Sequence, residues 1–475
     1  MTSTSISPSP EEGKPGWWHT VRDALSGAEG KDFTSGPIRP ALLLLAIPMV
    51  LEVALESVFA VVNMFWVNRL GAEAVAIVGL TEAMLSVIYA LGMGLGIGAT
   101  AMVARRIGEK DPEAASRTAV QAIVIGVLVS IPIAVVGGLF ATDLLRLMGA
   151  SPETAERGTG FARIMFIGNA AILLLFLINA IFRGAGDAAV AMRCLWIANL
   201  CNLVLDPLLI FGVGPFPELG VEGAAVATTI GRGIGVLYQL HRLRGADRRF
   251  TIERRHLRID PALIVRLFRL SSTGIGQILI GTASWIGLVR IVATFGAEAV
   301  AGYTIAIRVV LFALLPSWGL SNAAATMVGQ SLGAGKPERA EEAVWRAGRL
   351  NLWFLGSLGL LFVIASPAIV AIFTTDPEVS RYAVLGLRII SAGFPFYAYG
   401  MVMSNAFNGA GDTRTPTLLN FFCFWLWEIP LAFMLAKVAG YGPTGAFIAI
   451  PVAFSTFALV SAMLFKRGTW KRRAV

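Results

Sequence analysis

Three polar side chains lie on one face of an apolar segment, where together they could bind a small cation. Asn199, Asn202 and Asp206 are spaced i, i+3 and i+7, which places them on one side of an α-helix. Pro207 comes next and has no N–H, so the carbonyl oxygen of Leu203 loses its usual helical partner. A carboxylate, two amide oxygens and a free carbonyl are hard ligands suited to Na⁺ or a proton. The alternative interpretation is a proline kink whose amides join helices.

A second polar set lies in an earlier apolar segment. Glu52, Glu56 and Asn63 are spaced i, i+4 and i+11, again about one helical face. Asn179 adds an amide in a further segment. A charged side chain at membrane depth costs at least ~2.5 kcal/mol on insertion scales, so each one needs a reason. We predict that the two glutamates, with Asn199, form an auxiliary proton or substrate site.

The chain repeats itself at a spacing of 225 residues. GAEAVA occurs at Gly71–Ala76 and again at Gly296–Ala301, and FRGAGD at Phe182–Asp187 matches FNGAGD at Phe407–Asp412. Two like halves in a membrane are typical of a transporter, whose binding site between the halves faces either side in turn.

The polar residues do not follow the repeat. Their counterparts in the second half are mostly neutral: Gln277, Gly281 and Leu288 for the first segment, Ser404 for Asn179, and, after a three-residue shift, Phe424 and Glu428 for Asn202 and Asp206. The N-terminal half is therefore expected to hold the ion-coupling chemistry, with Glu428 as a secondary candidate.

The composition is that of a helical membrane protein, with 56% hydrophobic and 15% charged residues. Apolar segments long enough to cross a bilayer, which takes about 20 residues as helix, recur along the chain. They are residues 40–66, 74–103, 118–141, 158–182, 189–213, 221–240, 263–293, 299–327, 346–373, 383–407, 416–437 and 443–465. These runs do not alternate in polarity as the strands of a membrane β-barrel do. We predict an all-α polytopic membrane protein with twelve transmembrane helices in two homologous six-helix bundles.

Basic residues indicate the orientation. Loop Lys and Arg, Arg183 among them, concentrate in the even-numbered connections and the C-terminal tail, which places both termini in the cytosol. The net charge of +9 is explained by this topology, and no nucleic-acid partner is expected. The predicted domains are a disordered cytosolic tail (1–39), an N-terminal lobe (40–240), a basic cytosolic linker (241–262), a C-terminal lobe (263–465) and a basic tail (466–475).

Catalytic chemistry is not expected. The three cysteines fall inside predicted spans and the three histidines outside them, so neither a disulfide framework nor a metal cluster is implied. Span ends carry no clustered Asp, His or metal-ligand motif, so an enzyme is not predicted, and no cofactor is expected beyond a coupling ion.

Residues 40–465 resemble the multidrug and toxic compound extrusion (MATE) family, in particular its DinF-like prokaryotic branch. The matching motifs are VNxFxVxRLGAEAVA at Val62–Ala76, NLVLDPLLIFG at Asn202–Gly212, GAAVAT at Gly223–Thr228 and the two GAGD turns. The resemblance implies two six-helix bundles arranged as a V, a cavity that opens to either side in turn, and export driven by a Na⁺ or H⁺ gradient.

By position, the resemblance assigns Asn179, Asn202, Asp206 and Thr228 to the cation site of the N-terminal lobe. Where the family usually has an Asp in the first span, this chain has Asn63. The site therefore lacks one of two carboxylates, and Glu56, two turns earlier, is a candidate to supply the missing charge.

The expected function is secondary active efflux. We expect a monomer in the prokaryotic inner membrane, in contact with the lipid bilayer, that exports cationic or amphipathic xenobiotics in exchange for H⁺ or Na⁺ by alternating access. The alternative is a flippase for lipid-linked sugars on a related fold. Such a protein tends to have a cationic cavity, whereas the acids and amides of the first half favour a cationic or neutral substrate.

Overall fold

The protein is almost entirely helical. The computed structural model describes residues 17–27, 31–245 and 249–473, and no strand occurs among them. A short helix α1 (Trp17–Ser26) precedes the first half, which consists of α2 (Ile38–Asn68), α3 (Ala72–Gly108), α4 (Pro112–Leu139), α5 (Ala141–Leu147), α6 (Pro152–Ile167), α7 (Asn169–Ala185), α8 (Ala188–Phe211) and α9 (Val221–Leu243).

The second half has the same order of helices. It consists of α10 (Pro261–Ala293), α11 (Ala297–Gly333), α12 (Pro337–Ala371), α13 (Pro377–Ala392), α14 (Phe394–Gly409), α15 (Arg414–Asn420), α16 (Ile429–Phe433) and α17 (Pro443–Lys466). Two π-helical segments, η2 (Phe421–Glu428) and η3 (Met434–Val438), join α15 and α16 into one span.

Matching backbone features start the matching helices of the two halves. Gly71 and Gly296, which precede α3 and α11, have φ of 100° and 108°, a region that only glycine enters readily. The next helix of each half begins with a proline, Pro112 or Pro337, which suits the first turn because no N–H partner is needed there. The repeated motifs are therefore repeated helix starts.

The spans agree with the twelve-helix prediction. Among the described residues, ten helices or joined helices are long and apolar enough to cross a membrane. The other two predicted spans are α9, which carries Arg232 halfway along its length, and the pair α13–α14, which is interrupted at Gly393. Gly168 interrupts the pair α6–α7 at the same place in the first half. The described helices form two homologous bundles of six spans.

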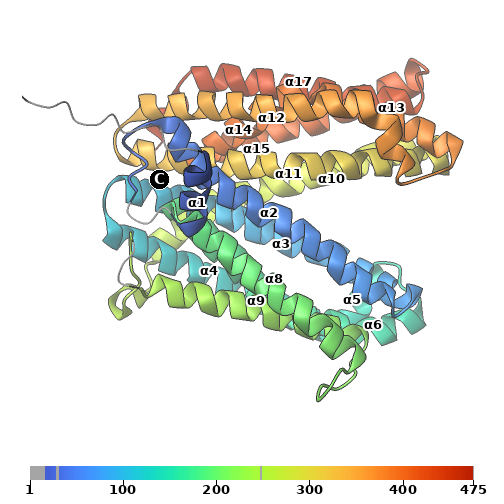
Figure 1. Ribbon diagram of the computed structural model, residues 1–475, viewed down its shortest axis with the longest axis horizontal. Helices are drawn as coiled ribbons and strands as arrows, with labels where there is room; N and C mark the ends of the chain where they lie inside the picture. The colour runs from blue at the N-terminus through green and yellow to red at the C-terminus, as the bar shows by residue number, and fades with distance from the viewer. Residues whose placement is uncertain (1–16, 28–30, 246–248, 474–475) are drawn as a thin grey trace, which may run out of the picture.

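The two bundles meet at one end and separate toward the other, as Figure 1 shows. At the joined end, α3 of the N-terminal lobe and α11 of the C-terminal lobe make very close contact. A Cβ on Gly108 would lie 2.1 Å from the carbonyl oxygen of Gln330, and a Cβ on Gly333 would lie 2.1 Å from that of Arg105. The two glycines are 225 residues apart, so the contact is symmetric. Small residues permit such close helix approach.

Helix α1 also lies at the joined end (Figure 1), and one prediction about the N-terminal tail is corrected. A disordered tail was predicted over residues 1–39, but residues 17–26 form α1. Ala24 and Phe33 are buried, and Arg339 of α12 donates to the carbonyl oxygens of Phe33 and Ser35. Apolar contacts and arginine hydrogen bonds thus order this part of the tail, while residues 1–16 and 28–30 lie outside the described residues.

The predicted linker, residues 241–262, is packed against the N-terminal lobe where it is described. Phe250 and His256 are buried. Ser116 of α4 donates to the carbonyl oxygen of Thr251 at 2.9 Å, and Gln121 donates to that of Arg258 at 2.8 Å. Residues 246–248 of this segment lie outside the described residues. The connection between the lobes is therefore attached to α4 along much of its length.

Candidate ion and substrate site

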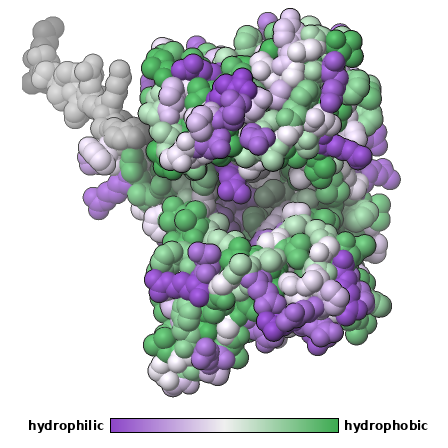
Figure 2. All heavy atoms as spheres, turned by 90° about the vertical axis from the view of Figure 1, so that its right-hand side faces the viewer, coloured by the Kyte–Doolittle hydropathy of each residue, from purple (hydrophilic) through white to green (hydrophobic). Residues whose placement is uncertain are grey.

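A cavity of about 630 Å³ lies between the lobes, and Figure 2 shows the hollow from the open end. The charged residues that line it all come from the N-terminal lobe: Glu52, Glu56, Glu82, Arg183 and Arg232. The polar residues that the C-terminal lobe contributes are all neutral amides: Gln277, Asn322, Asn405 and Asn408. The two walls of the cavity thus differ in charge.

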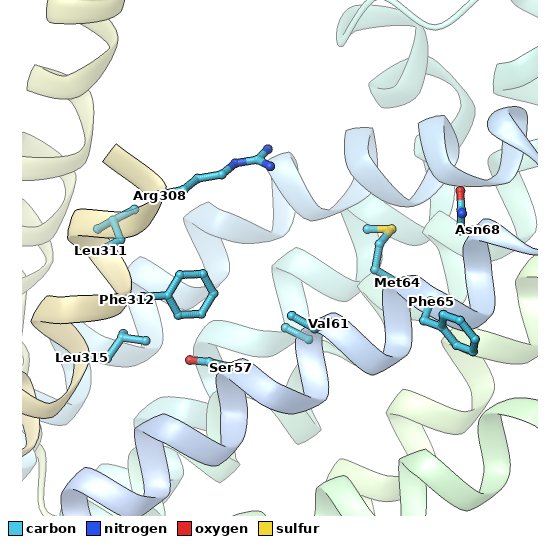
Figure 3. A pocket seen from close by; sticks show the side chains of 10 residues that line it. Ser57, Val61, Met64, Phe65, Asn68, Arg308, Leu311, Phe312 and Leu315 are labelled. Carbon is cyan, nitrogen blue, oxygen red and sulfur yellow. The ribbon is translucent and has the colours of Figure 1, made fainter. Parts of the chain in front are cut away.

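A second, largely apolar pocket of about 640 Å³ adjoins this cavity between α2 and α11. Figure 3 shows Val61 and Met64 of α2 on one side and Phe312 and Leu315 of α11 on the other. Met64 and Leu315 line both pockets. The polar cavity therefore continues into an apolar vestibule that both lobes build.

Helices α2 and α8 bring the two predicted polar faces together. Asn199 donates to Glu56 at 2.9 Å, and Asn63 donates to Asp206 at 3.2 Å. Both pairs are 143 residues apart, so the two helices run parallel and in register. The spacings in the sequence correctly placed each set on one face, and the packing of α2 on α8 makes the two faces complementary.

Asp206 lies behind the cavity wall and is only 1% exposed. The wall in front of it includes Asn63, Asn202 and Thr228. With its amide oriented to satisfy its neighbours, Asn202 donates to both carboxylate oxygens of Asp206, at 2.7 and 2.8 Å, and accepts from Thr228 at 2.9 Å. No Lys, Arg or His of the described chain forms an ion pair with Asp206. This carboxylate is therefore buried among neutral hydrogen-bonding groups.

Asn179 belongs to a different cluster. It was grouped with Asp206, but in the structure it donates to Glu52 at 3.1 Å and accepts from Gln239 at 2.6 Å. Arg183 forms an ion pair with Glu52 at 2.8 Å. Arg183 was counted among the loop arginines, yet it lies in the last turn of α7 and its side chain lines the cavity.

A third cluster surrounds Glu56. Besides Asn199, its neighbour is Arg232 of α9, with 4.0 Å between guanidinium and carboxylate. Arg232 donates to the hydroxyl of Tyr89 at 3.1 Å and lies over the ring of that tyrosine, 5.5 Å from its centroid. Glu82 lines the cavity as well. Sequence reasoning missed Arg232 and Tyr89, although an arginine in the middle of an apolar span was a usable signal.

Glu428, the predicted secondary site, lies elsewhere. It ends the π-helical segment η2, is 3% exposed and is not among the residues that line the cavity. The described residues give it no hydrogen bond and no ion pair. The structure therefore brings together Asp206, Asn202, Thr228 and Asn63, and it separates Glu428 from them.

The cluster around Asp206 offers ligands for a hard cation. Among the described residues, no group of three or more His, Cys, Asp or Glu could hold a metal ion. One carboxylate, two amide oxygens and a hydroxyl are instead the oxygen ligands that Na⁺ accepts, once the amides of Asn63 and Asn202 turn their oxygens toward the ion. The same carboxylate can take up a proton.

Comparison with known proteins yields one consistent result. The family model MatE matches residues 48–208 and 275–434, once in each half. The probable multidrug resistance protein YoeA of Bacillus subtilis is 27% identical over 439 residues, which cover 92% of this chain and 95% of that protein. The probable multidrug resistance protein NorM of Thermotoga maritima is 26% identical, covering 92% of this chain and 94% of that protein.

Solved structures match over the same length. A crystal structure of MATE in the bent conformation superposes with a TM-score of 0.86 and 26% sequence identity. The match covers 92% of this chain and 96% of that one. The likeness therefore includes both lobes.

Proposed function

This chain belongs to the MatE family of multidrug and toxic compound extrusion transporters, and on that premise we propose that it is a secondary active antiporter. It exports drugs or other amphipathic xenobiotics in exchange for H⁺ or Na⁺, by alternating access. The relatives named as multidrug resistance proteins support the export of drugs.

The isolation of Asp206 is the observation that carries the proposed ion coupling. Its carboxylate is 1% exposed at membrane depth and has only neutral hydrogen-bond partners among the described residues. A buried charge without a counter-ion is strongly unfavourable, so the site requires a cation. Because no arginine or lysine supplies that charge, a proton or Na⁺ from solution can bind and leave during the cycle.

The proposed orientation follows from the basic loops. If the termini are cytosolic, as the distribution of Lys and Arg favours, then the hollow between the lobes in Figure 2 faces the outside. Rocking of the two bundles about the joined end would then expose the same cavity to the cytosol. We place the transporter, as a monomer, in the cytoplasmic membrane of a prokaryote.

The flippase alternative has less support. A cavity for a diphosphate headgroup is expected to be cationic, but the lining here holds three glutamates against two arginines. One of those arginines, Arg183, is paired with Glu52.

The test is transport in proteoliposomes. A lipophilic cation dye is supplied under a pure Na⁺ gradient and then under a pure pH gradient. Asp206→Asn should assemble normally but lose transport driven by either gradient, because a neutral amide no longer requires a cation. Glu428→Gln, the change at the matching position of the other lobe, is the control and should retain transport. Gradient-driven transport by the Asp206→Asn variant would refute the proposed site.

A further inference from the structure

The two arginines of the cavity differ in how they are paired. Arg183 forms a direct ion pair with Glu52, with nitrogen and oxygen 2.8 Å apart. Arg232 forms one hydrogen bond, to the hydroxyl of Tyr89, and its nearest carboxylate oxygen, on Glu56, is 4.0 Å away. Its side chain is only 14% exposed, and it lines the cavity. Apart from the bond to Tyr89, its N–H groups make no hydrogen bond to the described residues.

The geometry around Arg232 holds the guanidinium in a preset position. The ring of Tyr89 lies beneath it at 5.5 Å, and Tyr89 is itself packed edge-on against Phe176, with ring centroids 5.8 Å apart. A cation over an aromatic face is attracted to it, and a fixed side chain loses little entropy when a ligand binds. A planar guanidinium with free N–H groups matches the two oxygens of a carboxylate.

Glu56 does not occupy this position. Its other carboxylate oxygen accepts from Asn199 at 2.9 Å, which holds the side chain toward α8. A separation of 4.0 Å from Arg232 is too long for a hydrogen bond. A carboxylate on a bound molecule can therefore make direct hydrogen bonds to Arg232, while Glu56 and Glu82, which line the same cavity, remain available to a positive group on that molecule.

We propose that Arg232 is a carboxylate-binding subsite of the transport cavity, and that the transporter accepts zwitterionic amphiphiles through it. The positive end of such a molecule lies near Glu56 and Glu82, and its apolar body lies against the aromatic and methionine side chains of the N-terminal wall, Phe161, Met165 and Phe176. This proposal rests on the proposed export function, because it names a substrate class for the same cavity.

A matched pair of dyes tests it. Rhodamine B carries a free carboxylate and is a zwitterion, whereas its ethyl ester is a cation of nearly the same shape. Binding of both dyes to the purified protein is measured by fluorescence anisotropy, and uptake of both is measured in proteoliposomes. Arg232→Gln should raise the ratio of the acid's Kd to the ester's Kd by about tenfold, the loss expected for a hydrogen bond to a charged group. Arg232→Lys, which keeps the charge but loses the planar fork, should raise the ratio less.

The control is the double variant Glu52→Gln, Arg183→Asn. Because it removes both members of an ion pair and leaves the net charge of the cavity unchanged, it should change the affinity for both dyes alike. If Arg232→Gln changes the Kd of the acid and of the ester by the same factor, the subsite is overturned. Arg232 would then serve only to balance the charge of the glutamates. The subsite is also overturned if the parent protein binds the acid no more tightly than the Arg232→Gln variant does. If the parent binds both dyes but transports neither, the proposed export function fails and the binding ratio still decides the subsite.

Discussion

The two lobes share a hydrogen-bonding scaffold and differ in charge. In the N-terminal lobe, Asn179 donates to Glu52 at 3.1 Å. At the positions 225 residues later, Gln277 donates to Ser404 at 3.2 Å. The first contact joins α2 and α7, and the second joins the corresponding helices α10 and α14. Both lobes thus have a hydrogen bond at this place, but the carboxylate of the first lobe is an amide in the second.

The charged partner is replaced in the same way. Arg183, which pairs with Glu52, corresponds to Asn408, and both positions line the cavity. The C-terminal wall therefore has neither the acid nor the base of this pair. The backbone features of the repeat, its helix-starting glycines and prolines, thus place the spans, whereas individual side chains decide which lobe carries charge.

The largest expected effect, on stability, comes from introducing the neutral residues of the C-terminal lobe into the N-terminal lobe. Glu52→Gln leaves Arg183 unpaired in a buried site and should lower the free energy of unfolding by about 3–5 kcal/mol. The double variant Glu52→Gln, Arg183→Asn reproduces the neutral pair of the C-terminal lobe and should recover most of that loss. Thermal and chemical unfolding in detergent measures both. If the double variant is no more stable than the single one, the two lobes do not share an interchangeable scaffold.

The symmetric contact at the joined end can be broken from either lobe. Gly108→Ala or Gly333→Ala places a Cβ against a backbone carbonyl of the other lobe and should favour the state in which this end opens. Overpacking costs about 1–3 kcal/mol, which moves the equilibrium by about 5- to 150-fold. Leu147, the last residue of α5, and Ile372, between α12 and α13, are exposed. Because α5 and α13 lie at the open end in Figure 1, spin labels at these two residues should report a shorter distance.

Gly79→Ala is the control for this measurement, because a Cβ there meets no atom within 4 Å. If only one of the two glycine variants shifts the distance between the spin labels, the two halves of the contact contribute unequally to its stability. An unchanged distance in both variants would show that the α3–α11 contact does not set the conformational equilibrium.

The smallest expected effect comes from Asn63→Asp at the proposed ion site, which introduces the residue that the resemblance to the family implies there. Asn63→Asp adds a second carboxylate beside Asp206 and sharpens the charge difference between the lobes. A second charge at contact distance contributes about 1 kcal/mol where water screens it, so Na⁺ should bind about fivefold more tightly. Isothermal titration calorimetry measures this. Asn68→Asp, on the same helix beyond the site, should change Na⁺ affinity less, and an equal change in both variants would place position 63 outside the ion site.

Much of the fold could be predicted because its signals are local or repeated. Apolar runs, helix-starting glycines and prolines, and the 225-residue spacing predicted the spans and the two bundles. Helix α1 was not predicted, because its ten residues mix polar and apolar side chains and contain no long apolar run. Such a composition does not distinguish a short helix from a disordered tail. What orders the segment after α1 is Arg339, about 300 residues away in the sequence.

The candidate site divides in a similar way. Helical periodicity correctly placed Asn199, Asn202 and Asp206 on one face of α8, because side-chain direction follows from spacing along one helix. The partner of each of these side chains depends on how the neighbouring helix is shifted along its axis and rotated about it. A single sequence does not contain this information.

The sequence by itself determined that this is a two-lobed helical membrane protein with most of the acids of its spans in the first lobe. Only the tertiary structure decided that Asn179 bonds to Glu52 instead of joining Asp206, that Arg183 lies in the cavity, and that Asp206 has no basic partner among the described residues. The physical reason is that burial and ion pairing are properties of several helices at once, whereas hydropathy and helical periodicity are properties of one.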